Sequence, residues 1–277
     1  MKYKIVADSS CDLDIELQER LNISLVPFKI DVEDNTFIDD ENLDTMELIN
    51  AMKASSNPIR TSCPSPGDFA LEYKDADTIF VVTISGHLSG TYNSALLAKE
   101  MINEEYPDKF IHVFDSKSAS VGETLIVMKI HELIEGNLSN LEIVEKVEKY
   151  IKEMKTYFIL ESLDNLIKNG RISKTKGLIA NVLNMKPIMR ANDGTIELVE
   201  NVRGSKRAFK RLVDIIGESG VIFEETTLAI SHTNALKVGE DLKAEIQERY
   251  NFKDIVLVKT AGLSAGYAYD GGIILAF

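Results

Sequence analysis

Four segments of the chain concentrate hydroxyl side chains in front of predicted helices. They read Asp8-Ser9-Ser10-Cys11-Asp12, Thr61-Ser62-Cys63-Pro64-Ser65-Pro66-Gly67, Ser85-Gly86-His87-Leu88-Ser89-Gly90-Thr91-Tyr92-Asn93-Ser94 and Asp115-Ser116-Lys117-Ser118-Ala119-Ser120. Hydroxyl groups and the free N–H groups of a helix N-terminus can both donate hydrogen bonds to an anion. Together the four segments predict a small, neutral pocket for one negatively charged group.

Other chemistries are less well supported by the motifs. Each hydroxyl segment alone has an ordinary explanation, because Ser, Thr and Asp are common N-cap residues. The chain has no GxxxxGK[ST] and no GxGxxG motif, which argues against a nucleotide or dinucleotide site. The stretch from Gly86 to Gly90 misses the GxSxG nucleophile elbow, since Ser89 stands one place too late. A hydrolase that uses Ser89 or Ser94 stays open as an alternative.

The charge balance limits the kinds of partner. With 31 Lys and Arg against 44 Asp and Glu, the net charge is −13, which argues against nucleic acid and anionic membrane surfaces as partners. Residues 31–47 hold acidic side chains and no Lys or Arg, and we expect them to form a solvated loop. Two basic clusters surround Arg171 and Arg203. Each of these arginines lies beside a glycine, where a guanidinium can be aimed at a carboxylate or phosphate.

Cysteines, histidines and hydropathy exclude further classes. Two cysteines, Cys11 and Cys63, do not make a disulfide framework. They form no CxxC motif, and the four histidines are scattered, so the sequence predicts no metal site either. No apolar run approaches the roughly 18 residues of a membrane span. The first residues read as a strand rather than a signal peptide. We therefore expect a cytoplasmic protein with no integral membrane association.

Alternating strands and helices position the hydroxyl segments. Strands are predicted at residues 3–8, 23–30, 78–84 and 110–114, and helices at 13–21, 45–54, 91–105, 121–135 and 140–155. This order predicts an α/β fold with a parallel sheet and helices on both faces. In such a sheet the strand-to-helix loops share the carboxyl edge, where ligands bind. The hydroxyl segments should therefore come together there.

The second half of the chain has a different pattern. Asn192-Asp193-Gly194 lies between two strand-like stretches at 186–190 and 195–202, which predicts a hairpin whose turn needs positive φ angles. Helices are expected at 206–216 and 235–249, and strands at 227–231, 254–258 and 273–277. We place a domain boundary near Thr156, which gives an N-terminal α/β domain over residues 1–156 and a second α/β domain over residues 157–277.

Taken in order, these motifs resemble the DegV family of bacterial fatty-acid-binding proteins, and the resemblance covers nearly the whole chain. The matching pieces are Asp8-Ser9-Ser10-Cys11-Asp12-Leu13, Thr61-Ser62-Cys63-Pro64-Ser65-Pro66, Leu88-Ser89-Gly90-Thr91-Tyr92-Asn93-Ser94-Ala95, Asp115-Ser116, Leu166-Ile167-Lys168-Asn169-Gly170-Arg171-Ile172, Asn184-Met185-Lys186-Pro187-Ile188 and Arg203. The resemblance implies a two-domain fold that holds one long-chain fatty acid between the domains. It also implies a carrier subunit without catalysis of its own, which presents the carboxylate to a separate fatty-acid kinase.

The resemblance carries residue roles with it. Thr61 and Ser94 match the family's carboxylate-binding hydroxyls, and Ser62, Ser89, Gly90 and Thr91 lie in the same head-group loops. Arg203 matches an arginine near the head group, and Arg171 matches a Gly-Arg element expected at the partner-facing rim. No cofactor is implied beyond the bound fatty acid. A regulatory protein that responds to its bound lipid is a further alternative.

One position departs from the family pattern. Family members carry a His followed by Gly-Pro-Gly near the last strand, whereas here Tyr267 takes the place of the His and Asp270 that of the Pro. A phenol can hydrogen-bond a carboxylate, but it cannot become cationic. We therefore expect lipid binding to carry over better than phosphoryl transfer.

Overall fold

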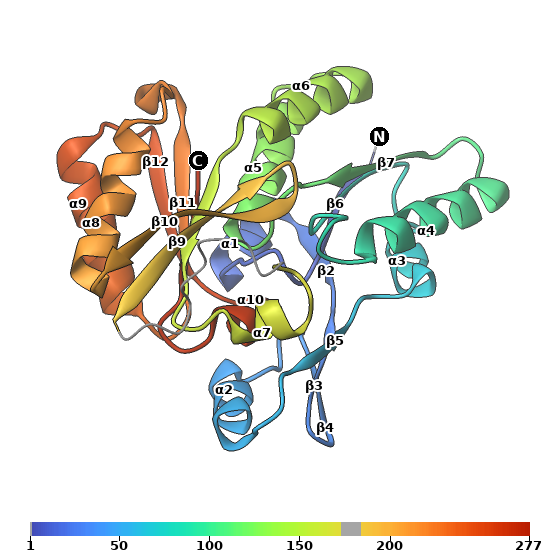
Figure 1. Cartoon of the computed structure of the whole chain (residues 1–277). Coiled ribbons are helices and arrows are strands. Elements are labelled where there is room, and N and C mark those ends of the chain that lie inside the picture. Colours follow the sequence, from blue (N-terminus) through green and yellow to red (C-terminus); the bar gives the residue numbers. More distant parts are fainter. Residues whose placement is uncertain (1, 173–183) are drawn as a thin grey trace.

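The computed structural model describes residues 2–172 and 184–277 and contains three β-sheets with flanking helices (Figure 1). The first is a parallel sheet in the order β2-β1-β6-β7. Its strands are β1 (Tyr3–Asp8), β2 (Ile23–Val26), β6 (Thr78–Thr83) and β7 (Phe110–Asp115). Every residue of β6 is buried, as the continuous apolar pattern predicted for a strand covered on both faces.

Helices pack on both faces of the parallel sheet, which confirms the predicted architecture. One face carries α1 (Ile15–Leu21), α5 (Val121–Glu135) and α6 (Asn140–Glu153), whose apolar side chains form a core with Phe80 and Phe114. The other face carries α3 (Pro66–Glu72) and α4 (Thr91–Glu105), which pack on Ile79 and Val81. None of the helices within residues 2–172 and 184–277 is long and apolar enough to cross a membrane.

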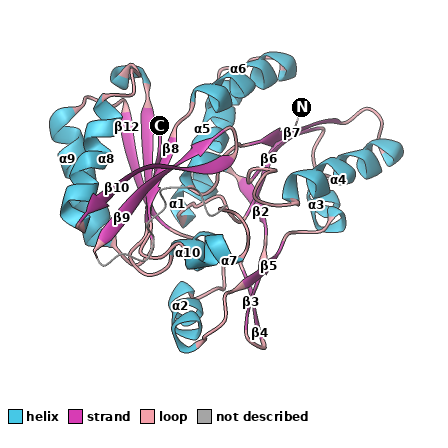
Figure 2. Ribbon diagram, viewed as in Figure 1, coloured by secondary structure: helices cyan, strands magenta, loops and turns pink. Residues whose placement is uncertain are grey.

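The second sheet is mixed and has the order β10-β9-β8-β13-β11-β12. Its strands are β8 (Thr156–Ile159), β9 (Met185–Asn192), β10 (Thr195–Arg203), β11 (Thr227–His232), β12 (Asp254–Lys259) and β13 (Ile273–Ala276). The helices α8 (Ser205–Gly217) and α9 (Leu236–Arg249) cover one face (Figure 2). The other face meets α5, where Val121 and Leu125 pack on Ala229 and Ala276. The division into domains at Thr156 stays a prediction.

The hairpin predicted in the second half is present. β9 and β10 are antiparallel, with Asn192 paired to Thr195. Asp193 and Gly194 have φ angles of 45° and 83°, which is the positive region that this turn requires. The hairpin reaches from the six-stranded sheet toward the parallel sheet (Figure 1).

A small third sheet corrects two expectations. The order is β4-β3-β5, with β3 (Lys29–Val32), β4 (Asn35–Ile38) and β5 (Arg60–Ser62), and it projects with α2 (Thr45–Ala54) away from the larger sheets (Figure 2). The single strand predicted over residues 23–30 was wrong, because β2 ends at Val26 and β3 belongs to another sheet. The solvated loop predicted over residues 31–47 was also wrong, because this segment contains β4 and the start of α2. The residues of β4 are mostly exposed, so no apolar alternation signals the strand.

Two short helices connect the projecting unit to the sheets. They are α7 (Asp164–Lys168) and α10 (Gly262–Ala268), and the Asn165 side chain of α7 donates a 2.8 Å hydrogen bond to the carbonyl of Gly266 in α10. Ile59 packs with Ile30 and Leu48 in the core of the projecting unit, and Tyr267 of α10 joins the edge of that core. The two short helices therefore lie where all three sheets approach one another.

Candidate ligand-binding site

A cavity with about 830 Å³ of empty space, partly open to solvent, lies among the three sheets. Its apolar wall consists of Phe28, Ile84, Leu88, Ala119, Phe158, Leu160, Leu166, Ala191, Ile196, Leu263, Ala268 and Ile274. The polar residues that line it are Ser10, Thr61, Ser89, Lys117, Ser118, Ser120, Thr156, Arg171, Thr195, Ser264 and Tyr267.

Thr61 and Tyr267 form a hydroxyl pair on the cavity wall. Thr61 lies in β5 and Tyr267 in α10, and their side-chain oxygens are 3.1 Å apart. Tyr267 also packs beside Phe28 and Leu263, which are part of the apolar wall. Two hydroxyls next to an apolar surface could receive a small polar or anionic head group.

The other predicted head-group residues surround the start of α4. The Ser89 and Thr91 hydroxyls are 2.8 Å apart, and a Cβ placed on Gly90 would lie 3.7 Å from the sulfur of Cys63. The loop before α3 and the start of α4 are therefore neighbours, as predicted. Of this set only Thr61 and Ser89 are among the described residues that line the cavity, and Ser62, Gly90, Thr91 and Ser94 are not.

The structure separates the two arginines. Arg171 lines the cavity, and its guanidinium donates hydrogen bonds to the carbonyls of Leu88 at 3.1 Å and Asn169 at 2.6 Å. Sequence reasoning placed it at a partner-facing rim, whereas the structure gives it a half-buried position on the wall. Arg203 is exposed at the end of β10, in a separate surface depression shared with Lys206 and Arg207.

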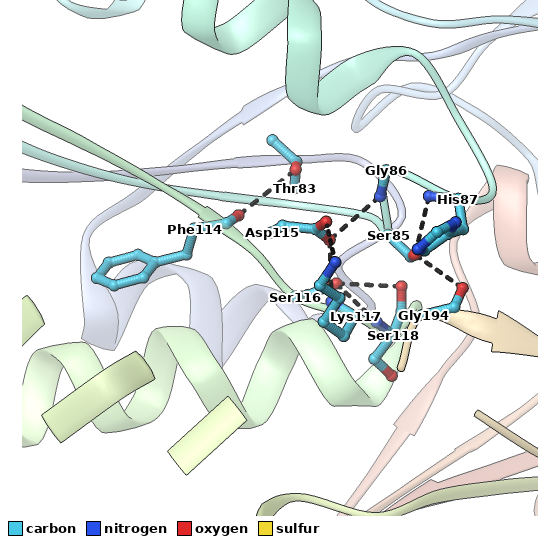
Figure 3. A network of polar contacts seen from close by, with 10 residues as sticks. All are labelled: Thr83, Ser85, Gly86, His87, Phe114, Asp115, Ser116, Lys117, Ser118 and Gly194. Carbon is cyan, nitrogen blue, oxygen red and sulfur yellow. Dashed lines mark hydrogen bonds and ion pairs between the residues drawn. The ribbon is translucent and has the colours of Figure 1, made fainter. Parts of the chain in front are cut away.

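The β9–β10 hairpin forms the roof of the cavity. The Ser85 hydroxyl donates a 2.8 Å hydrogen bond to the carbonyl of Gly194 at its tip (Figure 3). A Cβ on Gly194 would lie 2.5 Å from the Ser85 oxygen and 2.9 Å from a ring carbon of His87. The tip therefore needs glycine both for its positive φ and for its close contact with the loop after β6.

The loops after β6 and β7 are tied together beneath this roof (Figure 3). One carboxylate oxygen of Asp115 accepts hydrogen bonds from the backbone N–H groups of Gly86 and Lys117, both at 3.1 Å. The other oxygen pairs with the Lys117 ammonium at 3.0 Å, which raises the pKa of Lys117. The Ser118 hydroxyl lies 2.7 Å from that of Thr156 and thus joins the β7 loop to β8.

Buried carboxyl groups near the cavity were not predicted from the sequence. Asp8 accepts hydrogen bonds from the backbone N–H of Ile84 at 2.8 Å and of Ser10 at 2.9 Å. Asp12 accepts one from the backbone N–H of Ala261 at 2.8 Å and another from the Ser120 hydroxyl. Burial raises the pKa of both Asp8 and Asp12 to about 7. The position of Asp8 and Asp12 inside a hydroxyl-rich segment was the sequence feature that could have indicated their burial.

Neither nucleophilic hydrolysis nor metal binding is supported by the arrangement of the described residues. Within residues 2–172 and 184–277, no hydrogen bond joins the ring of His87 to Ser89 or Ser94, which a serine nucleophile and its base would form. No group of His, Cys, Asp and Glu in that part of the chain could hold a metal ion.

The fold and the cavity define a class of protein, an α/β protein in which three sheets surround a largely apolar pocket. Comparison with known proteins gives the family. A family model described as "Uncharacterised protein, DegV family" matches residues 2–270. A DegV domain-containing protein of Streptococcus pneumoniae is 37% identical over 280 residues, covering 100% of this chain and 99% of its own. The chain belongs to the DegV family.

Solved structures of relatives have the same fold. A DegV family protein from Ruminococcus gnavus with vaccenic acid has a TM-score of 0.95 and 41% identity, covering 99% of both chains. The Streptococcus pneumoniae Fatty Acid Kinase (Fak) B3 protein loaded with linoleic acid has a TM-score of 0.91 and 36% identity, covering 100% of this chain and 99% of its own. A DegV family protein from Eubacterium eligens loaded with heptadecanoic acid has a TM-score of 0.91 and 32% identity, covering 99% of this chain and 98% of its own.

Proposed function

We propose that this protein binds one long-chain fatty acid in the cavity, with the carboxylate at the Thr61–Tyr267 hydroxyl pair. The observation that carries this proposal is an apolar cavity wall with two hydroxyls placed together on it. Relatives that are 32–41% identical were crystallised with vaccenic, linoleic and heptadecanoic acid. The positive charge of Arg171 on the same wall favours an anionic ligand.

The acyl chain, rather than the head group, sets the affinity. A few hydrogen bonds to a charged group contribute about 1–3 kcal/mol. Burial of a methylene contributes about 0.8 kcal/mol, so a long acyl chain contributes roughly 10 kcal/mol before the costs of binding. Residues such as Phe28, Phe158 and Ile196 supply the apolar surface that this requires.

Within the proposed function, the protein is a carrier that presents the carboxylate to a separate fatty-acid kinase, and catalysis belongs to that partner. Support comes from the similarity to the Fak B3 protein. Arg203, Lys206 and Arg207 form an exposed basic patch on a chain of net charge −13. Such a patch suits an acidic or phosphorylated partner.

Mass spectrometry of the purified protein tests the first step. Organic-solvent extraction should release a fatty acid, and the delipidated protein should bind added linoleic acid at a ratio of one. A protein that carries no fatty acid and takes up none would contradict the proposal. Ester hydrolysis that disappears in Ser89→Ala or Ser94→Ala would favour the hydrolase instead.

A further inference from the structure

Asp39 is a buried carboxylate that joins three parts of the cavity wall. Its side chain is 4% exposed. One oxygen accepts a 2.6 Å hydrogen bond from the backbone N–H of Gly262, and the other accepts 2.8 Å hydrogen bonds from the N–H of Leu263 and the Ser9 hydroxyl. The Ser9 oxygen in turn accepts a hydrogen bond from the N–H of Phe28 at 3.0 Å.

These contacts fix the first turn of α10. Gly262 and Leu263 are the first two residues of that helix, and their N–H groups have no partner within the helix. A Cβ on Gly262 would lie 2.5 Å from an Asp39 oxygen and 2.3 Å from a methyl group of Leu43. Only glycine therefore lets the helix approach the carboxylate this closely. The backbone of Asp39 also donates a 2.9 Å hydrogen bond to the carbonyl of Phe28.

The helix that Asp39 fixes carries one half of the proposed head-group site. α10 has only seven residues, so a shift of its first turn displaces Tyr267 near its other end. The Tyr267 hydroxyl must lie 3.1 Å from that of Thr61 for the two to act as a pair. Leu263 and Phe28, both connected to Asp39, line the cavity beside it.

We infer that Asp39 is a positioning residue for head-group recognition, acting through α10 to place the Tyr267 hydroxyl beside Thr61. This inference rests on the proposed function, because it concerns the site of the fatty-acid carboxylate. Asp39 itself lies outside the cavity lining. Through Asp39, the acidic segment 31–47, which was expected to be a solvated loop, supports the binding site from behind its wall.

The first test compares Asp39→Asn with Asp40→Asn, a variant of the exposed neighbour that removes the same charge. An amide at position 39 places an NH₂ group against N–H donors, so at least one hydrogen bond to α10 or Ser9 is lost. Affinities are measured for linoleic acid and for linoleyl alcohol, which has the same chain and a neutral head group. Circular dichroism and thermal unfolding verify that each variant is folded.

Asp39→Asn should weaken linoleic acid binding by up to about fivefold, the loss expected when the Tyr267 hydroxyl no longer meets the carboxylate. The affinity for linoleyl alcohol should change less than about twofold, since a neutral head group gains less from placed hydroxyls. Asp40→Asn should leave both affinities unchanged. Equal losses for both ligands, or no loss for the acid, would overturn the inference. A wild-type protein that binds neither ligand would instead contradict the proposed function.

A double-mutant cycle keeps the test decisive where Asp39→Asn is poorly folded. Gly262→Ala leaves Asp39 in place but pushes α10 away from it, so it should produce the same selective loss for the acid. In a Tyr267→Phe background, Gly262→Ala or Asp39→Asn should add little further loss, because both act through the same hydroxyl. Fully additive losses would show that Asp39 does not act through Tyr267.

Discussion

The hydroxyl groups of Thr61 and Tyr267 lie 3.1 Å apart and join β5 to α10 across 206 positions of the chain. Tyr267 is predicted to take the place of a histidine in the family pattern. A phenol can donate to a carboxylate or accept from Thr61, but it carries no positive charge. The pair can therefore recognise a carboxylate through neutral hydrogen bonds.

Replacing Tyr267 with Phe tests this recognition directly. The variant keeps the ring that packs beside Phe28 and removes only the hydroxyl, so linoleic acid affinity should fall by about 1 kcal/mol, which is roughly fivefold. Isothermal titration calorimetry measures the change. Tyr269→Phe is the matched control, because it removes a hydroxyl from a neighbouring tyrosine outside the cavity lining and should have no effect. Unchanged affinity in Tyr267→Phe would remove Tyr267 from the head-group site.

Replacing Tyr267 with His tests transfer rather than binding. An imidazole can carry a proton and a positive charge near neutral pH, which the phenol cannot. With a bacterial fatty-acid kinase and ATP, Tyr267→His should raise the rate of acyl-phosphate formation several-fold while the affinity for the fatty acid changes little. A rate equal to that of the wild type would show that the departure from the family pattern has no catalytic consequence.

Arg203 should serve the partner more than the ligand. It is exposed beside Lys206 and Arg207 and does not line the cavity. Arg203→Ala should therefore slow transfer to the kinase by about tenfold, the size expected for one charge-assisted contact. Its linoleic acid affinity should stay within about twofold of the wild type. Lys237→Ala removes an exposed charge from α9 and is the control. Equal losses of transfer and binding would contradict the assignment.

Local sequence patterns predicted the long helices and the hairpin because those signals are local. The helices expected at 91–105 and 121–135 have those bounds in the structure. Thr61 was predicted in a loop at the edge of the parallel sheet, yet it lies in β5 of a separate sheet whose pairing with β3 spans about thirty residues. Short, exposed strands that depend on distant partners carry no periodic signal.

Prediction of the site from the sequence was limited in the same way, because the site also depends on contacts between distant residues. Hydroxyl-rich segments pointed to Thr61 and Ser89, which line the cavity. The burial of Asp39 could not be predicted, because an acidic residue among other acidic residues reads as solvated until its distant partners, Gly262 and Leu263, are known. Arg171 was found as a candidate, but its carbonyl partners on Leu88 and Asn169 were not.

Gly194, at the tip of the hairpin that roofs the cavity, can be compared with Gly220, a glycine of similar backbone conformation elsewhere. Gly194 and Gly220 have φ angles of 83° and 77°, so alanine is strained at both positions. A Cβ on Gly194 meets the Ser85 oxygen at 2.5 Å, whereas one on Gly220 meets nothing within 4 Å. Gly194→Ala should therefore release bound fatty acid faster than wild type, and Gly220→Ala should not. Stopped-flow displacement measures the rates, and equal rates in the two variants would contradict a role for the hairpin tip in retention.

Stability should fall as the pH rises from 6 to 8, and Asp12 is one cause. Burial raises its pKa from 3.8 to about 7, so the folded state holds a proton there that the unfolded state has lost. A group whose folded pKa is raised contributes stability that is fully present below the unfolded pKa of 3.8 and is lost progressively as the pH rises from there through about 7.

Asp12→Asn separates this contribution from those of other groups. The amide stays neutral at every pH, like the protonated acid, so the free energy of unfolding should fall less steeply with pH than in the wild type. The difference between the two slopes should amount to about 1 kcal/mol between pH 6 and 8. Denaturation in urea at both pH values measures it, and Asp14→Asn, a change at the exposed N-cap of α1, gives the control slope. If the slope of Asp12→Asn were identical to that of the wild type, the Asp12 carboxyl would already be ionised in the folded protein at pH 6. The hydrogen bond that it accepts from the N–H of Ala261, just before α10, would then stabilise the ionised form.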